Sequence, residues 1–166
     1  MRGIVLLADI RFYDTVLFVH VTAIVLAFGP TFGYAFFHAF TERLNPRGVP
    51  AMWTATERAN MYLVTPAAIL ALITGLYLVI DLWEFSDVFV SVGILAILVL
   101  LGLIHGYLNP RGRQAIELAE RDIAVAGTGE VKLSEEYWAV SKRIAQVGSL
   151  AGLIIVVVIF FMVVKP

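Results

Sequence analysis

Four stretches of the chain contain no Asp, Glu, Lys or Arg, and they constrain the fold more than any other feature. They are Thr15–Thr41, Ala59–Ile80, Val88–Pro110 and Ile144–Val164. A membrane-spanning α-helix needs about 20 mostly apolar residues, and each stretch meets that length. Because backbone polar groups cannot stay unpaired in hydrocarbon, and the alternation of a membrane β-strand is absent, we expect four helices. The sequence predicts an all-α, four-helix transmembrane bundle that forms a single integral membrane domain over 1–166.

The composition narrows the class of protein further. Charged residues make up 15% of the chain, against about 25% in a soluble domain. A net charge of −1 gives no basic surface for a nucleic-acid partner, and the lack of cysteine excludes disulfides and thiolate metal sites. The first residues begin like a signal peptide, but Asp9 and Arg11 interrupt the apolar run. We therefore expect residues 1–14 to remain on the mature chain as a segment at the membrane surface.

Turn residues separate the predicted helices, which we place at about 15–40, 59–80, 87–108 and 144–164. The word Asn-Pro-Arg-Gly occurs at 45–48 and again at 109–112, and each copy is typical of a turn after a helix. The stretch 110–142 is polar and amphipathic, with a helix stop at 127–129 and Ser134 as the cap of the next helix. It predicts a helical extension outside the membrane.

Lysine and arginine are distributed unevenly between the two ends of the predicted bundle. Of the twelve, three lie between the first and second helices and six between the third and fourth. The remaining three are Arg2, Arg11 and Lys165, at the other end. Because positive charge is retained on the cytoplasmic side, we expect both termini on the outer side and both basic connections in the cytoplasm. This predicts a multi-pass protein of the cytoplasmic (inner) membrane, surrounded by the lipid bilayer.

The three histidines and one methionine are the candidate cofactor ligands. His20 lies in the outer third of the first helix, whereas His38 and His105 share the inner level. At about 1.5 Å per residue, His20 lies about 25 Å from that level, so it cannot share one haem iron with His105. His38 and His105 could ligate one iron if their helix faces converge. Met162 approaches the level of His20 and is the candidate second ligand of a haem held there.

Each histidine also has a simpler structural interpretation. A buried neutral histidine, hydrogen-bonded to a neighbouring helix, explains His20 as well as iron ligation does. An ionisable residue inside a membrane helix nevertheless favours a function by default. His38 and His105 lie near the predicted interface, where solvation is the favoured explanation.

Glycine spacing and the placement of acids bear on function. The small-xxx-small motifs at 29–33, 102–106 and 148–152 predict close helix contacts. Two of them lie in inner halves of helices, so we expect tight packing there and more room in the outer half. No carboxylate falls inside a charge-free stretch, which disfavours a proton- or cation-driven transporter. The glycine faces and the basic segment 111–143 suit an accessory subunit with a membrane protein partner or a second copy of the chain.

Several short segments resemble a known group of membrane proteins. They read ER at 57–58, LVTPAAIL at 63–70, GL at 75–76, HGYL at 105–108 and VVKP at 163–166. Together they resemble the superfamily of small bacterial membrane proteins that includes HemJ-type protoporphyrinogen oxidases and CopD-like copper-resistance domains. The first-helix segments HVTA at 20–23 and AFGPTF at 27–32 are similar to a predicted integral membrane family of unknown function in that group.

The resemblance implies a b-type haem and a bacterial inner membrane. A first-helix histidine is linked to haem binding in the HemJ-type enzymes, and His20 occupies the matching place, as haem and iron ligand. Those enzymes also carry basic residues later in the first helix and early in the third. The matching stretches here, at 27–29, 34–36 and 93–95, hold none. The methionines are scattered rather than clustered with histidine as copper sites prefer.

Three functions follow from this reading. The leading one is an integral membrane protein without assigned catalytic residues that binds haem b through His20. The alternatives are a structural or accessory subunit of a membrane complex and a HemJ-like protoporphyrinogen oxidase.

Overall fold

The computed structural model describes residues 12–82 and 87–164, and within these ranges it is helical with no strand, as the sequence predicts. Residues 1–11 of the expected surface segment lie outside the described residues. The elements are α1 (Phe12–Leu44), the 3₁₀ turn η2 (Pro46–Gly48), α2 (Val49–Ala59), the π-helix η3 (Asn60–Val64), α3 (Thr65–Leu82), α4 (Val88–Leu103), the π-helix η4 (Ile104–Leu108), α5 (Asn109–Ala126) and α6 (Glu135–Val164).

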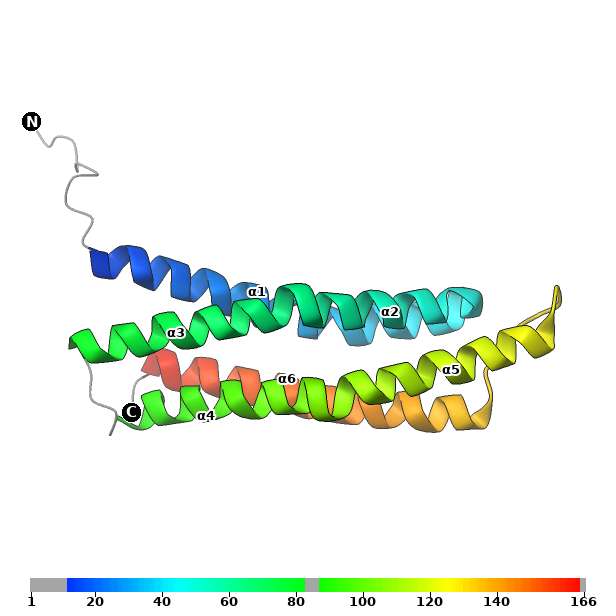
Figure 1. Cartoon of the computed structure of the whole chain (residues 1–166). Helices are drawn as coiled ribbons and strands as arrows, with labels where there is room; N and C mark the ends of the chain where they lie inside the picture. The colour runs from blue at the N-terminus through cyan, green and yellow to red at the C-terminus, as the bar shows by residue number, and fades with distance from the viewer. Residues whose placement is uncertain (1–11, 83–86, 165–166) are drawn as a thin grey trace, which may run out of the picture.

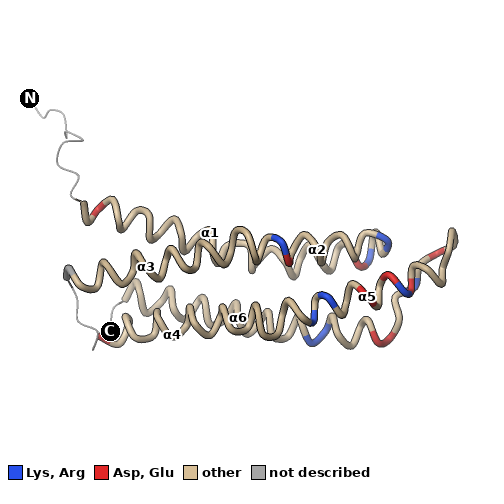
Figure 2. The backbone as a smooth tube through the Cα atoms, in the orientation of Figure 1, with Lys and Arg blue, Asp and Glu red and all other residues tan. Residues whose placement is uncertain are grey.

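Four rods in the described chain are long and apolar enough to cross a membrane, which confirms the predicted four-helix fold. They run antiparallel, so that residues 12 and 164 lie at the same end of the bundle (Figure 1). Their outward faces carry large apolar side chains, such as Phe18 and Ile80, that are about three-quarters exposed and suit contact with lipid. Most charged residues lie toward the opposite end (Figure 2).

The rods associate in two pairs, α1 with α3 and α4 with α6. Alanines make the closest contact between α1 and α3. Ala23 and Ala27 on α1, and Ala67 and Ala71 on α3, are 0–7% exposed and belong to one core cluster. In each helix the two alanines are four residues apart, so they form the small-xxx-small pattern that lets two backbones approach closely. The pattern accounts for the close packing of α1 on α3.

Two of the rods are continuous helices that each contain one π turn. The rod 49–82 contains η3 shortly before Pro66, and the rod 88–126 contains η4 shortly before Pro110. A proline inside a helix lacks an N–H donor and clashes with the carbonyl four residues earlier, and inserted π turns are one way to relieve this. The prediction that the Asn-Pro-Arg-Gly word at 109–112 forms a turn is therefore wrong, whereas the copy at 45–48 does form one.

A second core lies beyond the apolar stretches, at the charged end of the bundle. It is formed by α2, α5 and the first turns of α6, and its members include Trp53, Ala115, Ala119 and Tyr137. The predicted extension is thus built from both connections, since the segment after α1 folds as helix α2 and packs on α5. The apolar bundle therefore continues into a second, charge-bearing bundle formed by extensions of the same rods.

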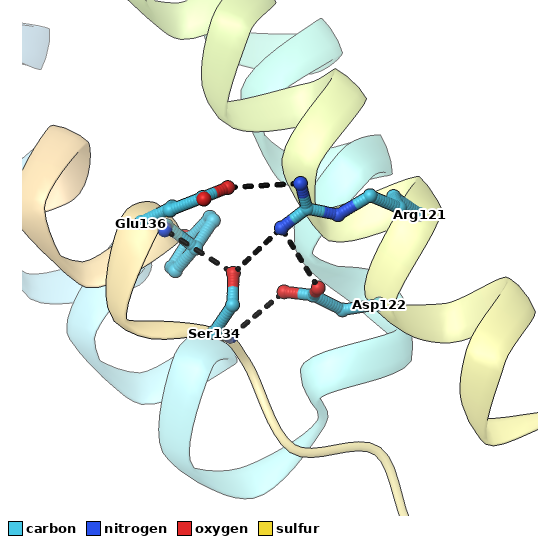
Figure 3. A network of polar contacts seen from close by, with 5 residues as sticks. Arg121, Asp122, Ser134 and Glu136 are labelled. Atoms are coloured by element: carbon cyan, nitrogen blue, oxygen red, sulfur yellow. Dashed lines mark hydrogen bonds and ion pairs between the residues drawn. The ribbon is translucent and has the colours of Figure 1, made fainter.

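Polar contacts close this extension where α5 turns back into α6 (Figure 3). Arg121 contacts both Asp122 and Glu136, and the Asp122 carboxylate accepts a 2.7 Å hydrogen bond from the backbone N–H of Ser134. Ser134 Oγ accepts from the N–H of Tyr137, which confirms Ser134 as the cap of the helix. Partial burial alone would raise the pKa of Asp122, but the bonds from Ser134 and the Arg121 charge outweigh it and lower that pKa.

Candidate functional site

Two cavities lined by described residues lie between the helix pairs. The first, of about 500 Å³, is toward the end that holds residues 12 and 164, and we call it the terminal cavity. The second, of about 560 Å³, is toward the charged end, and we call it the basic-end cavity. Phe28, Leu100 and Ile155 line both and lie between them.

His20 lies in the wall of the terminal cavity, with its ring orientation set by α3. Its Nδ1 lies 2.9 Å from the carbonyl oxygen of Ala71 and 3.1 Å from the hydroxyl of Thr74. A carbonyl can only accept, and the Thr74 hydroxyl donates to Leu70, so Nδ1 carries the proton. Nε2 is then left with a free lone pair, and within the described ranges no hydrogen bond engages it.

The close approach of α3 to His20 depends on a glycine. A Cβ at Gly75 would lie 2.9 Å from Cε1 of His20, closer than real Cβ contacts allow. The absence of a side chain there lets the imidazole lie against the α3 backbone. Gly75 thus belongs to the site although it has no polar group of its own.

Met162 on α6 lines the same cavity as His20. Its Cε packs directly on Gly93 of α4, where a Cβ would collide with it. Met162 belongs to the α4/α6 pair and His20 to the α1/α3 pair, so the cavity between the pairs is bounded by both candidate ligands. The structure therefore brings these two predicted site residues to one cavity.

His38 and His105 are not brought together. The interpretation of His38 as a solvated residue is wrong, because it is 8% exposed and lies in the wall of the basic-end cavity. Its Nε2 lies 2.9 Å from the Thr56 hydroxyl, which itself donates to Met52, so Nε2 carries the proton. His105 is exposed and bonds to Thr65 at 2.9 Å, and it is absent from the described lining of either cavity.

A buried carboxylate that the sequence analysis missed lies one turn beyond His38. Glu42 is 8% exposed, and its Oε1 accepts 2.6 Å hydrogen bonds from the hydroxyls of Tyr137 and Ser141. Tyr137 is fully buried and accepts in turn from the indole N–H of Trp53 at 3.1 Å. The Trp53 ring stacks on His38 with centroids 3.8 Å apart. These contacts join α1, α2 and α6 at the basic-end cavity.

The periodicity of α1 contained a signal for Glu42. Its residues that line the basic-end cavity include 28, 31, 35, 38 and 42, which follow the alternating spacing of three and four of one helix face. Ending the predicted helix at the first charge hid this continuation.

The predicted tight packing at the inner level, which holds His38 and His105, is also wrong. A Cβ at Gly102, Gly106 or Gly148 would meet nothing within 4 Å, and the larger cavity lies at this level. Alanines rather than these glycines make the close contact.

Across residues 12–82 and 87–164, no group of three or more His, Cys, Asp or Glu side chains is placed to hold a metal ion.

Comparison with known proteins gives a family but no activity. The family described as "Predicted integral membrane protein (DUF2269)" matches residues 14–166. The chain belongs to this family. No curated protein and no solved structure gives a significant match. The family description and the four apolar rods agree that this is an integral membrane protein. The two cavities are the places where an activity can be sought.

Proposed function

We propose that this integral membrane protein binds b-type haem in the terminal cavity, with His20 as an axial ligand to iron. The observation that carries the proposal is the hydrogen bond from Nδ1–H of His20 to the carbonyl of Ala71. Histidines that ligate metals usually donate their other ring N–H to a carbonyl or carboxylate, which fixes the tautomer and leaves Nε2 for the metal. His20 is held in that form by α3.

The cavity supports the same proposal. Its volume of about 500 Å³ lies within the range of about 300–1,000 Å³ usual for ligand sites. Its walls are mainly apolar, and Met162 stands on the facing helix pair as the proposed second ligand. Haem held by histidine and methionine is a known ligation type that supplies one-electron chemistry. The described lining holds no Lys or Arg, so we propose that the propionates reach water at the terminal end.

Absorption spectroscopy tests this proposal. Protein purified after haem-supplemented expression should show a Soret band, which His20→Ala should remove and His105→Ala should leave intact. His105 is the matched control because it has a similar hydrogen bond to a threonine but lines neither cavity in the described chain. Met162→Leu should keep the Soret band but convert the iron to a high-spin spectrum. A colourless wild-type protein would contradict the proposal.

The orientation in the membrane is part of the proposal. Nine of the twelve Lys and Arg residues lie at 43–58 or 111–143, in the end of α1, η2–α2 and the α5–α6 connection, and these segments lie at one end (Figure 2). Under the positive-inside rule this end faces the cytoplasm, and both termini face outward across a bacterial inner membrane. Labelling of single cysteines placed at Glu130 and Asp14 in intact cells should reach only position 14.

An accessory subunit is the second candidate function, and one observation favours it. Gly102 and Gly106 are exposed, and a Cβ at either would meet nothing within 4 Å of this chain. Such a small-xxx-small face is suited to a helix from a membrane protein partner or a second copy. Co-purifying chains, or a dimer mass that Gly102→Leu reduces to a monomer, would support it, and a monomer without partners would contradict it.

The protoporphyrinogen oxidase implied by the resemblance stays a prediction. It is tested by adding protoporphyrinogen to the purified haem-loaded protein and following porphyrin fluorescence. No increase over a His20→Ala control would exclude it.

A further inference from the structure

The basic-end cavity has a wall chemistry that differs from that of a haem site. Its lining is chiefly apolar, with aromatic side chains such as Phe28, Phe32 and Trp53. Its polar lining includes Tyr34, Glu42 and Asn60. The described lining contains two carboxylates and no Lys or Arg.

Among the described residues, only one of these two carboxylates forms an ion pair with a neighbouring cation. Glu57 forms an ion pair with Arg113. Glu42 is buried, and among described residues no cation lies within ion-pair distance of it. Its two hydroxyl donors both act on Oε1, at the 2.6 Å length typical of a hydroxyl donating to a carboxylate. No donor among the described residues reaches Oε2, and a buried anion without a countercharge is costly.

Two further acceptors line the same space. The hydroxyl oxygen of Tyr34 is buried and has no hydrogen-bond partner among the described residues. The side-chain N–H of Asn60 donates to Asn109 at 3.0 Å, which leaves the side-chain amide oxygen of Asn60 as an acceptor. Neutral His38, with its proton on Nε2, adds an Nδ1 lone pair and no positive charge.

We infer that the basic-end cavity is a binding site for a primary organic ammonium ion with an apolar, aromatic-sized body. A primary ammonium group carries one positive charge and three N–H donors and has no acceptor. The cavity offers the groups that match such an ion. They are one carboxylate without a described cation partner and several hydrogen-bond acceptors, in the wall of a chiefly apolar space. Anionic ligands are disfavoured, because the described lining has no cation to receive them. The site is separate from the proposed haem site, since Phe28, Leu100 and Ile155 lie between the two cavities.

Equilibrium binding to the full chain in lipid nanodiscs tests the assignment, with empty nanodiscs subtracted. The probes are 1-naphthylmethylammonium, its N-trimethyl derivative and neutral 1-naphthalenemethanol, which share one aromatic body. We expect the primary ammonium to bind most tightly, the trimethyl form less because it has no N–H donors, and the alcohol least. Equal affinity for all three, or no binding of the primary ammonium above empty discs, would overturn the inference.

Substitutions locate the binding. Glu42→Gln should weaken ammonium binding about tenfold or more, since a hydrogen bond to a charged group contributes about 1.5–3 kcal/mol. It keeps a carbonyl oxygen for Tyr137 and Ser141, and a melting curve checks that it folds. Glu117→Gln makes the same charge change on an exposed part of α5 and should have no effect.

Tyr34→Phe provides an independent test that leaves the carboxylate in place. It removes an unpartnered hydroxyl, so it should weaken ammonium binding by a few-fold without lowering stability. Ammonium binding that neither variant changes would overturn the inference. His20→Ala should leave ammonium binding intact. Failure of the haem proposal and failure of this inference can therefore be told apart, because one is read from the Soret band and the other from ammonium binding.

Discussion

The terminal cavity and the basic-end cavity are similar in size and share three wall residues, yet they offer opposite chemistry. In the first, α3 fixes one neutral imidazole in the wall of a mainly apolar cavity, and its Nε2 has no hydrogen-bond partner among the described residues. In the second, hydroxyls hold a buried carboxylate that has no countercharge among the described residues. One four-helix fold thus places an imidazole in the wall of one cavity and a buried carboxylate in the wall of the other.

The difference arises from the hydrogen-bond partners of His20 and Glu42. His20 uses a backbone carbonyl, so its environment depends on the α1–α3 contact made by alanines. Glu42 uses side chains from α6, so its environment depends on the extension in which Trp53 and Tyr137 pack. Variants should therefore affect one cavity and spare the other.

The largest expected effect is a double dissociation between the cavities. His20→Ala should abolish the Soret band and leave naphthylmethylammonium binding unchanged, because the variant removes the iron ligand and nothing from the other wall. Glu42→Gln should do the reverse. Spectra and binding curves on the same preparations measure both. If either variant removed both activities, the two cavities would behave as one site and the comparison would fail.

Gly75→Ala should have the next largest effect, a decrease of about tenfold in haem affinity. The new Cβ would lie 2.9 Å from Cε1 of His20, so the imidazole must move away from the Ala71 carbonyl that fixes its tautomer. Second-shell changes of this kind typically cost 10–100-fold in metal affinity. Haem titration measures it. Gly102→Ala is the control, because a Cβ there meets nothing within 4 Å, and an equal loss in both would contradict the mechanism.

Tyr137→Phe should lower the stability of the folded chain by about 2 kcal/mol. The hydroxyl is fully buried, donates to Glu42 and accepts from Trp53, so its removal leaves two buried groups each short of a partner. Thermal melting or denaturant titration in detergent measures the change. The exposed Tyr62→Phe is the control and should be neutral. Unchanged stability in Tyr137→Phe would show that the network around Glu42 does not depend on this hydroxyl.

The sequence was sufficient for the four helices because their signal is local. A run of about 20 uncharged residues must be helical in lipid whatever its neighbours do. The same reasoning failed at 109–112, where proline in a turn-like word was read as a helix end. The chain instead widens to a π turn at η4 and continues as α5. Turn-favouring residues therefore predict a helix end only where packing against neighbouring helices does not favour its continuation.

The site was less predictable because its contacts join distant segments. Depth along a helix correctly grouped His20 with Met162, since both line the terminal cavity. It also placed His38 and His105 on one level, but depth carries no information on which face a side chain occupies. His38 faces the cavity and His105 does not. Glu42 was missed because the helix was ended at the first charge, although the spacing of three and four on α1 continues through it.

The smallest expected effect is a change in stability that comes from the extension and leaves both cavities unaffected. The pKa of Asp122, about 20 Å beyond the apolar stretch by helical rise, is lowered in the folded chain by Ser134 and Arg121 in spite of partial burial. A lowered folded pKa adds stability above the unfolded value of about 3.9, and that stability is lost as pH falls through the folded value. Asp122→Asn should therefore lower the Tm slightly at neutral pH, and the difference from wild type should shrink toward about pH 3. Because the contacts lie far from His20 and Glu42, neither haem nor ammonium binding should change with this variant. A difference in Tm that grew at low pH would show that the folded chain favours the protonated carboxyl, and the sign of the electrostatic argument would be reversed.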